Sequence, residues 1–222
     1  TRYISVTFIE MLLVYAIILS LCVFIMRRNN KAFIGAAAFL LLLVISVTVR
    51  NYNALSQQAI IVYNINKHTA IDLIEGKTAF FICDSAVMND VKKQEFHIMN
   101  NRCRMMIDEI IPIPISESDF SVKETKLFAR NNLCYFAGKK LGIIDKAVYN
   151  TKKLDLDYLV VANNPDMTVE EILKQFNPAF IIFDASNTVM NVGKWTKQCE
   201  MIGKSYYSTR NSGAWRSFIN SR

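Results

Sequence analysis

The sequence predicts a layered α/β domain that two N-terminal transmembrane helices anchor to a membrane. Two long apolar stretches open the chain, and short β-branched runs bounded by turn residues follow them. In the last third, strand-like and helix-like segments alternate. Hairpins followed by a β-α-β-α-β order favour mixed sheets covered by helices. We therefore expect a transmembrane hairpin over residues 1–50, a polar linker over 51–58 and a soluble domain over 59–222.

The two apolar stretches have the length and composition of membrane spans. Residues 3–26 contain one charge, Glu10, and residues 32–49 contain none. A helix needs about 17–25 mostly apolar residues to cross the hydrocarbon core. A buried soluble hairpin is the alternative, but the unbroken apolar runs leave no polar face for solvent. The sequence therefore favours two spans.

The segment between the spans predicts their orientation. Residues 27–31 carry three positive charges, and basic loops tend to stay in the cytoplasm. Both ends of the hairpin then face outward, although Arg50 beyond the second span weakens the bias. We expect the soluble domain in the periplasm or outside the cell. Because the chain begins at Thr1 rather than at Met, we also expect it to come from a longer polytopic protein.

Apolar, often β-branched runs predict the strands of the soluble domain. The predicted strands are 59–63, 69–74, 77–82, 110–115, 127–130, 133–137, 141–144, 158–161, 180–183, 206–208 and 214–219. Gly76 predicts a tight hairpin between the second and third runs, and Asn131-Asn132 predicts another. Pro112 and Pro114 restrict their run to an edge strand or an extended loop.

Capping residues predict three helices. Asp84-Ser85 offers an N-cap for a helix that reaches about Met99. Thr168 and Glu171 form a capping-box pattern at the start of a helix that extends to Phe176. A third helix is expected over residues 195–201, ending at Gly203.

The sequence contains few residues suited to metal or nucleophilic catalysis. His68 and His97 are the only histidines, and neither lies in a cluster with metal-ligand spacing. The five cysteines form no C-x-x-C pair, so one or two disulfides remain possible without a defined pairing. Asp72, Asp84 and Asp184 lie within or at the ends of apolar strands. Such carboxylates can surround a cleft, and they also commonly cap the next helix.

Basic and aromatic residues offer a possible nucleic-acid surface. Residues 1–50 hold five Lys or Arg and one Glu, so the remainder of the chain carries a net charge of +3. The candidate phosphate contacts are Lys92, Lys93, Arg102, Arg104, Lys139, Lys140, Lys152 and Lys153. Tyr206, Tyr207 and Trp215 are candidates for base stacking. A solvated lysine face and a core position for the aromatic rings are the plainer interpretations.

Several segments match, in order, the motifs of a known family. In that family a strand leads into Asp-Val-Gly-Gln-Gly-Asp-Ala and a hairpin ends in Ile-Asp-x-Gly. Here Val62–Ile71 and Phe81–Ser85 occupy these places, and only Ala70 and Asp84 are kept literally. The later matching segments are Leu159–Pro165, Asn177–Asn187 and Gly203–Ala214. With these segments the chain resembles the C-terminal part of the ComEC family of DNA-uptake (competence) membrane proteins, most of all its Bacteroidetes-type members.

The resemblance implies an αββα domain of the metallo-β-lactamase type whose metal site has degenerated. The family's His-x-His-x-Asp-His motif is missing, and Asn163-Asn164 replace its His-His pair. Neutral Asn is a poor zinc ligand beside His or Cys, so we expect no metal, other cofactor or catalytic residue. The residues that would line the vestigial cleft are Asp72, Asp84, Asn163, Asn164, Asp184 and Asn187.

The resemblance also implies a role in transport. We expect a non-catalytic, membrane-proximal domain of a channel that takes up single-stranded DNA. The expected partners are the membrane, single-stranded DNA, the rest of the channel and other competence proteins. One alternative is a residual Mg²⁺-dependent nuclease, which requires Asp72, Asp84 and Asp184 to converge. The other is an anchored scaffold without a DNA role, in which Lys92, Lys139, Lys140 and Lys152 do not gather with aromatic residues.

Overall fold

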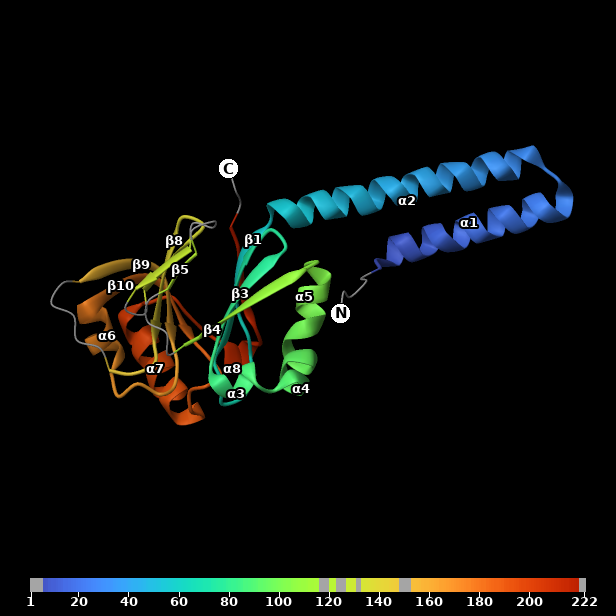
Figure 1. The fold of residues 1–222 in the computed structure, drawn as a ribbon. Coiled ribbons are helices and arrows are strands. Elements are labelled where there is room, and N and C mark those ends of the chain that lie inside the picture. Colours follow the sequence, from blue (N-terminus) through green and yellow to red (C-terminus); the bar gives the residue numbers. More distant parts are fainter. Residues whose placement is uncertain (1–5, 116–119, 123–126, 131–132, 148–152, 220–222) are drawn as a thin grey trace.

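Two antiparallel helices project from a body that contains two β-sheets (Figure 1). The computed structural model describes residues 6–115, 120–122, 127–130, 133–147 and 153–219. The body is mixed α/β, as the sequence predicts, and the chain passes from the helical hairpin directly into the first sheet.

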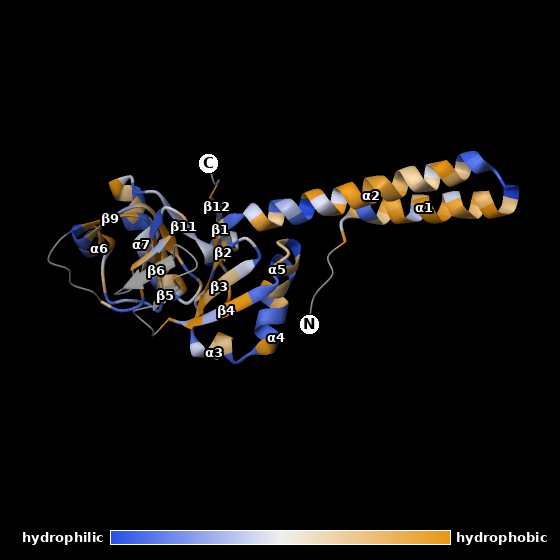
Figure 2. Cartoon of the chain, turned by 45° about the horizontal axis from the view of Figure 1, so that its top comes forward, coloured by the Kyte–Doolittle hydropathy of each residue, from blue (hydrophilic) through white to orange (hydrophobic). Residues whose placement is uncertain are grey.

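The hairpin consists of α1 (Phe8–Arg27) and α2 (Asn30–Ser56), and both helices are long and apolar enough to cross a membrane. Most of their apolar side chains are exposed on the protein surface, and the polar residues gather at the turn and the open end (Figure 2). Thr7 begins α1 with a capping box, Arg28 ends it in a left-handed conformation, and Asn29 caps α2. The turn is therefore encoded locally.

An ion pair closes the open end of the hairpin. Glu10 is 2% exposed and lies 3.3 Å from the Arg50 guanidinium across the two helices. The same carboxylate accepts a hydrogen bond from the backbone N–H of Thr7. Because a charge this close to the hydrocarbon is costly without a partner, Arg50 stabilises Glu10 at this depth.

The first sheet has the order β12-β1-β2-β3-β4 and the second the order β11-β10-β9-β8-β7-β6-β5. The strands of the first sheet are β1 (Gln58–Val62), β2 (Ala70–Glu75), β3 (Thr78–Cys83), β4 (Glu109–Pro114) and β12 (Trp215–Phe218). Those of the second are β5 (Phe120–Val122), β6 (Leu127–Arg130), β7 (Leu133–Phe136), β8 (Lys139–Ile144), β9 (Leu154–Val161), β10 (Phe176–Phe183) and β11 (Tyr206–Ser208). Strands β8 to β11 are parallel, whereas β5 to β8 form antiparallel pairs.

Three apolar clusters define four layers in the order helix, sheet, sheet, helix. The central cluster packs side chains such as Leu73 and Phe80 of the first sheet against Val160 and Ile182 of the second. The outer face of the first sheet is covered by α3 (Ser85–Met88), α4 (Val91–Gln94) and α5 (Asn100–Arg104). The outer face of the second is covered by α6 (Val169–Gln175) and α7 (Val189–Ile202). The predicted αββα order is confirmed.

Most of the predicted elements are confirmed. The β2–β3 hairpin turns at Gly76, whose φ is +58°, and β4 is an edge strand. Thr168 and Glu171 form both hydrogen bonds of the capping box, and Gly203 ends α7 in the left-handed region. The β6–β7 hairpin is present, although Asn131 and Asn132 lie outside the described residues.

Other elements differ from the prediction. The helix expected up to Met99 is broken after Met88, where Asp90 caps a new turn, and it continues through a π-helical turn (Glu95–Met99) into α5. Residues 51–56, expected as part of a linker, extend α2 because they contain neither Pro nor Gly. Strands β9 and β10 and helix α7 begin earlier than predicted, and β5 and α8 (Thr209–Ser212) were not predicted.

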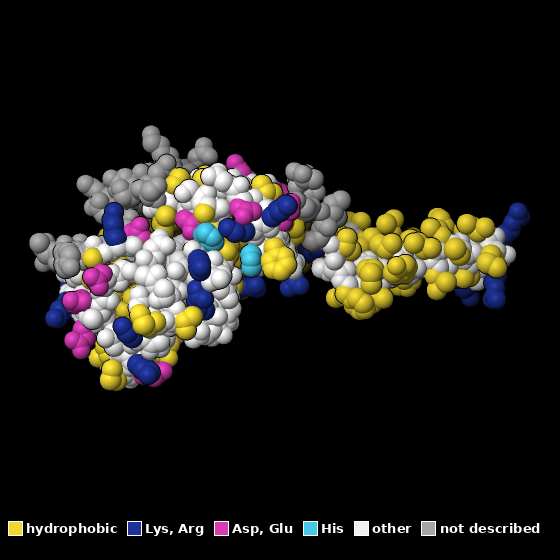
Figure 3. Space-filling view, turned by 90° about the horizontal axis from the view of Figure 1, so that it is seen from below, with side chains coloured by type: hydrophobic (Ala, Val, Ile, Leu, Met, Phe, Trp, Pro, Cys, Tyr) yellow, Lys and Arg dark blue, Asp and Glu magenta, His cyan; other side chains and the backbone are white. Residues whose placement is uncertain are grey.

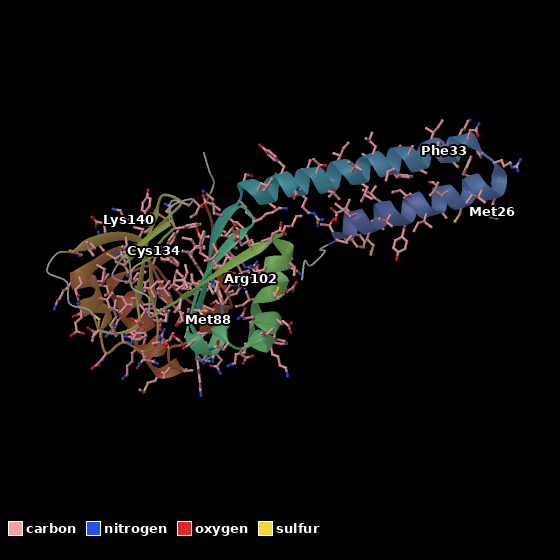
Figure 4. All side chains as sticks on the ribbon, in the orientation of Figure 1. Met26, Phe33, Met88, Arg102, Cys134 and Lys140 are labelled. Carbon is pink, nitrogen blue, oxygen red and sulfur yellow. The ribbon has the colours of Figure 1, made fainter. Side chains whose placement is uncertain are left out.

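A buried ion pair joins the α5 layer to the first sheet. Arg102, labelled in Figure 4, donates from Nε and Nη2 to the two carboxylate oxygens of Asp72 at 2.9 and 2.6 Å. The Tyr63 hydroxyl donates to the same carboxylate at 2.8 Å, and the guanidinium lies 4.3 Å from the centroid of the Phe81 ring. Burial and the neighbouring Asp72 charge both raise the pKa of Tyr63, so the phenol stays protonated and remains a donor.

Replacing Arg102 by Met tests the structural role of this pair. Arg102→Met leaves Asp72 as an uncompensated buried charge and should lower the free energy of unfolding by about 3–5 kcal/mol. The double variant Asp72→Leu/Arg102→Met should recover most of that loss, because no charge then stays buried. Urea unfolding in detergent measures both, with the exposed Arg104→Met as a control expected within about 0.5 kcal/mol of wild type. Equal losses in the single and double variants would contradict this account.

Candidate functional site

The carboxyl ends of strands from both sheets meet at one end of the body. Strands β1 and β3 end there in the first sheet, and β8 to β11 end there in the second. Hydrogen bonds join the sheets at this end. The backbone N–H of Lys67 donates to the Ala185 carbonyl at 2.9 Å, and the Thr69 hydroxyl donates to Asp184 Oδ2 at 2.6 Å. In open α/β sheets, ligands bind at such ends.

Asp184 lies at the centre of this end and is fully buried. Its Oδ1 accepts from the backbone N–H of Ser186 at 3.0 Å, from the Ser186 hydroxyl, and from the Asn187 amide at 3.1 Å. Burial raises the pKa of Asp184 to about 6, the hydrogen bonds from Ser186 and Thr69 lower it, and the nearby Asp84 charge adds a further rise. Both carboxylate oxygens of Asp184 thus accept hydrogen bonds from protein donors, and the side chain is closed off from solvent.

Asn163, Asn164 and Asn187 are structural at this end of the sheets. The Asn187 amide donates to the Val161 carbonyl at 2.6 Å, and its Oδ1 accepts from the Asn164 backbone N–H at 2.8 Å. Asn164 Oδ1 accepts from the backbone N–H of Thr188, the N-cap of α7, at 2.6 Å. Asn163 and Asn164 both have positive φ, which Asn tolerates better than most residues. The pair that replaces His-His in the family motif therefore shapes the loop between β9 and α6.

Asp84 belongs to a chain of polar contacts that includes His68 and Lys93. Its Oδ1 caps α3 through the Val87 backbone N–H at 2.9 Å, as predicted, and its Oδ2 lies 3.0 Å from His68 Nδ1. Lys93 Nζ lies 3.2 Å from His68 Nε2. Since an ammonium only donates, His68 accepts at Nε2 and donates from Nδ1 to Asp84. Asp84 and Asp184 are linked through Thr69, whose backbone N–H donates to Asp84 at 3.2 Å.

Positive side chains border this end of the sheets. Lys67 is exposed, Lys93 is partly exposed, and Arg210 donates to Asn66 Oδ1 and to the Ala185 carbonyl at 3.0 and 2.9 Å. Figure 3 shows Lys and Arg side chains around the two histidines on the face seen from below. We call Lys67, His68, Lys93 and Arg210 the basic rim. A rim of this kind favours anionic ligands over cationic ones.

The structure separates other predicted site residues from this end. Asp72 is buried between the first sheet and α5, on the face that points away from the second sheet. It is paired there with Arg102, so neither side chain is available to a ligand. The assignments of Asp72 to the cleft and of Arg102 to nucleic-acid contact are therefore corrected. A charge at either position needs the other because both side chains lie in the apolar interior.

The remaining candidate lysines do not form one surface. Lys139 lies on β8 and makes an ion pair of 2.9 Å with Asp157, and the exposed Lys140 follows it (Figure 4). Lys153 is exposed before β9, at the opposite end of the parallel strands from the basic rim. Lys92 and Arg104 are exposed on the helical layer of the first sheet, and Lys152 lies outside the described residues.

The aromatic candidates pack within the protein. Trp215 contacts Tyr158 and Phe180, with ring centroids 4.9 and 6.1 Å apart, at the central cluster. Tyr206 packs on Phe183 and donates to Glu200 at 2.7 Å. The Tyr207 hydroxyl donates to the Ser212 carbonyl at 2.8 Å. These rings form part of the fold, which is the plainer of the two interpretations.

A pocket of about 510 Å³ lies beside the Asn164 loop, between α6 and α7. Its walls include Asp166, Glu171, Lys194 and Trp195. The Trp195 indole donates to the Met167 carbonyl at 2.9 Å, and the Glu171 carboxylate accepts from Thr168. Hydrogen bonding to Thr168 lowers the pKa of Glu171. The pocket is thus lined by groups that already hold the loop and the first turn of α6.

Within the described residues, no group of three or more His, Cys, Asp or Glu side chains is arranged to hold a metal ion. The pair of metals that the metallo-β-lactamase type would hold does not fit these residues, because Asp184 is buried and the side chains of Asn164 and Asn187 bond to backbone groups. All five cysteines are free, and burial raises the pKa values of Cys83 and Cys134 to about 12. These buried thiols stay protonated and unreactive.

Sequence reasoning did not identify Thr69, Ser186, Lys67 or Arg210 as part of this end. Thr69 and Asp184 are 115 residues apart, and Asn66 and Arg210 are 144 apart. No local spacing encodes such contacts. The only available signal was that Asp72, Asp84 and Asp184 lie within or at the ends of apolar strands, and of these three the structure brings Asp84 and Asp184 to this end.

The fold and the site define an α/β domain with two helices that are long and apolar enough to cross a membrane and with a polar end bordered by basic side chains. The sequence matches the family model of the ComEC C-terminal domain over residues 60–219. The chain belongs to the ComEC C-terminal domain family, a family of competence DNA-uptake membrane proteins. No curated protein and no solved structure matches the chain.

The raised pKa of Asp184 predicts how stability varies with pH. A carboxyl group whose pKa is higher in the folded state stabilises the fold below its unfolded pKa, and this stabilisation is lost as pH rises through about 6. Asp184→Asn should remove that contribution, which is on the order of 3 kcal/mol between pH 4 and 7. The measurement is the difference between the stability–pH curves of wild type and variant, obtained from unfolding in detergent. Parallel curves would show that Asp184 ionises normally in the fold.

Proposed function

We propose that the chain is the membrane-proximal, non-catalytic part of a competence-type channel protein that takes up single-stranded DNA across the bacterial inner membrane. Its soluble domain, residues 59–222, acts as a metallo-β-lactamase-like module without metal ligands. The basic rim contacts the DNA backbone on the outer side of the membrane. The rest of the channel, upstream of Thr1, supplies the conducting path, and other competence proteins deliver the strand.

The observation that carries the non-catalytic role is the saturation of Asp184 and Asp84 by protein donors. Asp184 accepts from Thr69, Ser186 and Asn187, and Asp84 accepts from two backbone N–H groups and faces His68. A two-metal hydrolase needs carboxylates and imidazoles that converge on an open position. Here the same strand ends hold the two sheets together, so the residues serve the fold.

The basic rim supports an anionic partner such as DNA. Lys67 and Lys93 flank His68, and the topology expected from the basic loop of the hairpin puts the domain on the side where DNA arrives. The residual-nuclease alternative requires Asp72 to join the other two carboxylates, and Asp72 is paired with Arg102 instead. The scaffold alternative agrees with the separation of Lys92 from Lys139 and Lys140, so the DNA experiment must decide between it and our proposal.

The experiment is a titration of the full chain in nanodiscs with labelled single-stranded DNA at several salt concentrations. We expect binding that weakens steeply with salt. Each phosphate that a lysine neutralises adds about 0.7 to the slope of log K against log salt, so Lys67→Gln/Lys93→Gln should make this slope shallower. The matched control, Lys174→Gln/Lys204→Gln, removes the same charge near the opposite ends of β10 and β11 and should bind as wild type does.

The same samples test for catalysis. DNA incubated with Mg²⁺, Mn²⁺ or Zn²⁺ should stay intact, because the strand-end carboxylates are engaged by protein donors. Metal-dependent cleavage abolished by Asp84→Ala would overturn the non-catalytic role. No binding at any salt concentration would favour the scaffold.

A further inference from the structure

The helical layer formed by α4, the π-helical turn and α5 carries an exposed stripe with mixed apolar and basic character. Lys92, Phe96, Asn100 and Arg104 follow one another at intervals of four residues, and all four are exposed. Residues at this spacing share one side of a helix. On the opposite side, Ile98 and Arg102 are buried against the first sheet. We call the four exposed residues the α4–α5 stripe.

Phe96 is the unusual member of this stripe. Its side chain is 82% exposed, and its ring makes a T-shaped contact with the His97 ring, with centroids 4.9 Å apart. A phenylalanine in water at the middle of a well-packed helical layer loses the free energy that burial would supply. Apolar rings flanked by Lys and Arg are typical of helices that lie in the membrane interface.

The α4–α5 layer, which carries the stripe, lies on the side of the body that the hairpin enters. In Figures 1 and 2, α5 is the helix of the body next to the beginning of α1, and the α4–α5 layer runs across the hairpin axis. The second sheet and α7 lie on the side away from the hairpin. With α1 and α2 in a bilayer, the α4–α5 layer is therefore the helical layer that faces the headgroups.

The junction between α2 and β1 holds the body in this orientation. One residue, Gln57, separates the helix from the strand, and its side-chain amide donates to the carbonyls of Gly76 and Met105 at 2.8 and 2.6 Å. Its own carbonyl accepts from the Gly76 backbone N–H at 2.8 Å. A Cβ at Gly76 would lie 3.0 Å from the Leu55 carbonyl oxygen, so the turn fits directly under the helix end. Met105 ends α5, so the same amide ties the α4–α5 layer to the transmembrane helix.

We propose that the α4–α5 stripe is a docking surface for the lipid bilayer in which the chain is anchored. Phe96 enters the headgroup–acyl boundary, and Lys92 and Arg104 contact anionic headgroups while their aliphatic stems lie along the interface. Continuity with the membrane anchor, the basic charge and the unburied ring all point to this occupant. The stripe shares no residue with the basic rim, although Lys92 and Lys93 are neighbours on α4, and its assignment does not depend on the DNA role.

Tryptophan fluorescence in nanodiscs tests the position of Phe96. In the full chain carrying Phe96→Trp, lipids brominated high on the acyl chain should quench the added indole emission, and that emission in unbrominated lipids should lie to the blue of a solvent-exposed indole. The matched control, Met201→Trp, replaces an 80% exposed residue at the far end of α7 and should show neither effect. Emission from Trp195 and Trp215 is subtracted with the wild-type chain. Equal behaviour of the two variants would overturn the proposal.

A charge series distinguishes lipid from DNA as the occupant. Adding Lys92→Gln/Arg104→Gln to Phe96→Trp should reduce the quenching in discs that contain phosphatidylglycerol, and it should have little effect in discs of phosphatidylcholine alone. Quenching that disappears when single-stranded DNA is added, or equal quenching in both kinds of disc irrespective of the two charges, would overturn the assignment of the stripe to anionic lipid.

Discussion

The contact between Thr69 and Asp184 is the constraint on which the rest of the soluble domain depends. It joins the loop before β2 to the end of β10, and so it fixes how the two sheets meet above the central apolar cluster. Ser186 and Asn187 complete the hydrogen bonding of the buried carboxylate. Asn187 also donates to the Val161 carbonyl and is linked through Asn164 to the start of α7. A catalytic centre at this place would need open coordination positions. The carboxylate oxygens of Asp184 instead accept hydrogen bonds from Thr69, Ser186 and Asn187.

Asp72 and Asp184, the carboxylates buried among the described residues of the domain, are stabilised in different ways. Asp72 is balanced by a bidentate guanidinium, whereas Asp184 is held by the neutral donors of Thr69, Ser186 and Asn187. Neutral donors offset the loss of hydration only in part, and the pKa of Asp184 rises accordingly. The domain thus buries an ion pair under α5 and, between the sheets, a carboxyl group that is held by uncharged donors.

The sequence predicted the elements well wherever the signal was local. Gly76, the Thr168–Glu171 capping box, Gly203 and the prolines of β4 each act within a few residues, and each predicted its turn, cap or edge correctly. The break between α3 and α4 was missed because Asn89 and Asp90 are compatible with a continuous helix until Asp90 caps the next turn. The site was only partly predictable. Asp84, Asn163, Asn164, Asp184 and Asn187 gather at one end, but the partners that decide their chemistry come from distant parts of the chain.

Gln57 is the one residue between the helical hairpin and the first sheet, so the two are joined without a flexible linker. Many anchored domains hang from flexible tethers and sample a wide range of orientations. In this protein a tilt or piston movement of α2 is transmitted straight into β1, which lies inside the first sheet between β12 and β2. The hairpin and the two-sheet body are therefore expected to rotate together as one rigid unit. A small tilt of the hairpin in the bilayer then moves the end of the domain farthest from the membrane over a larger distance.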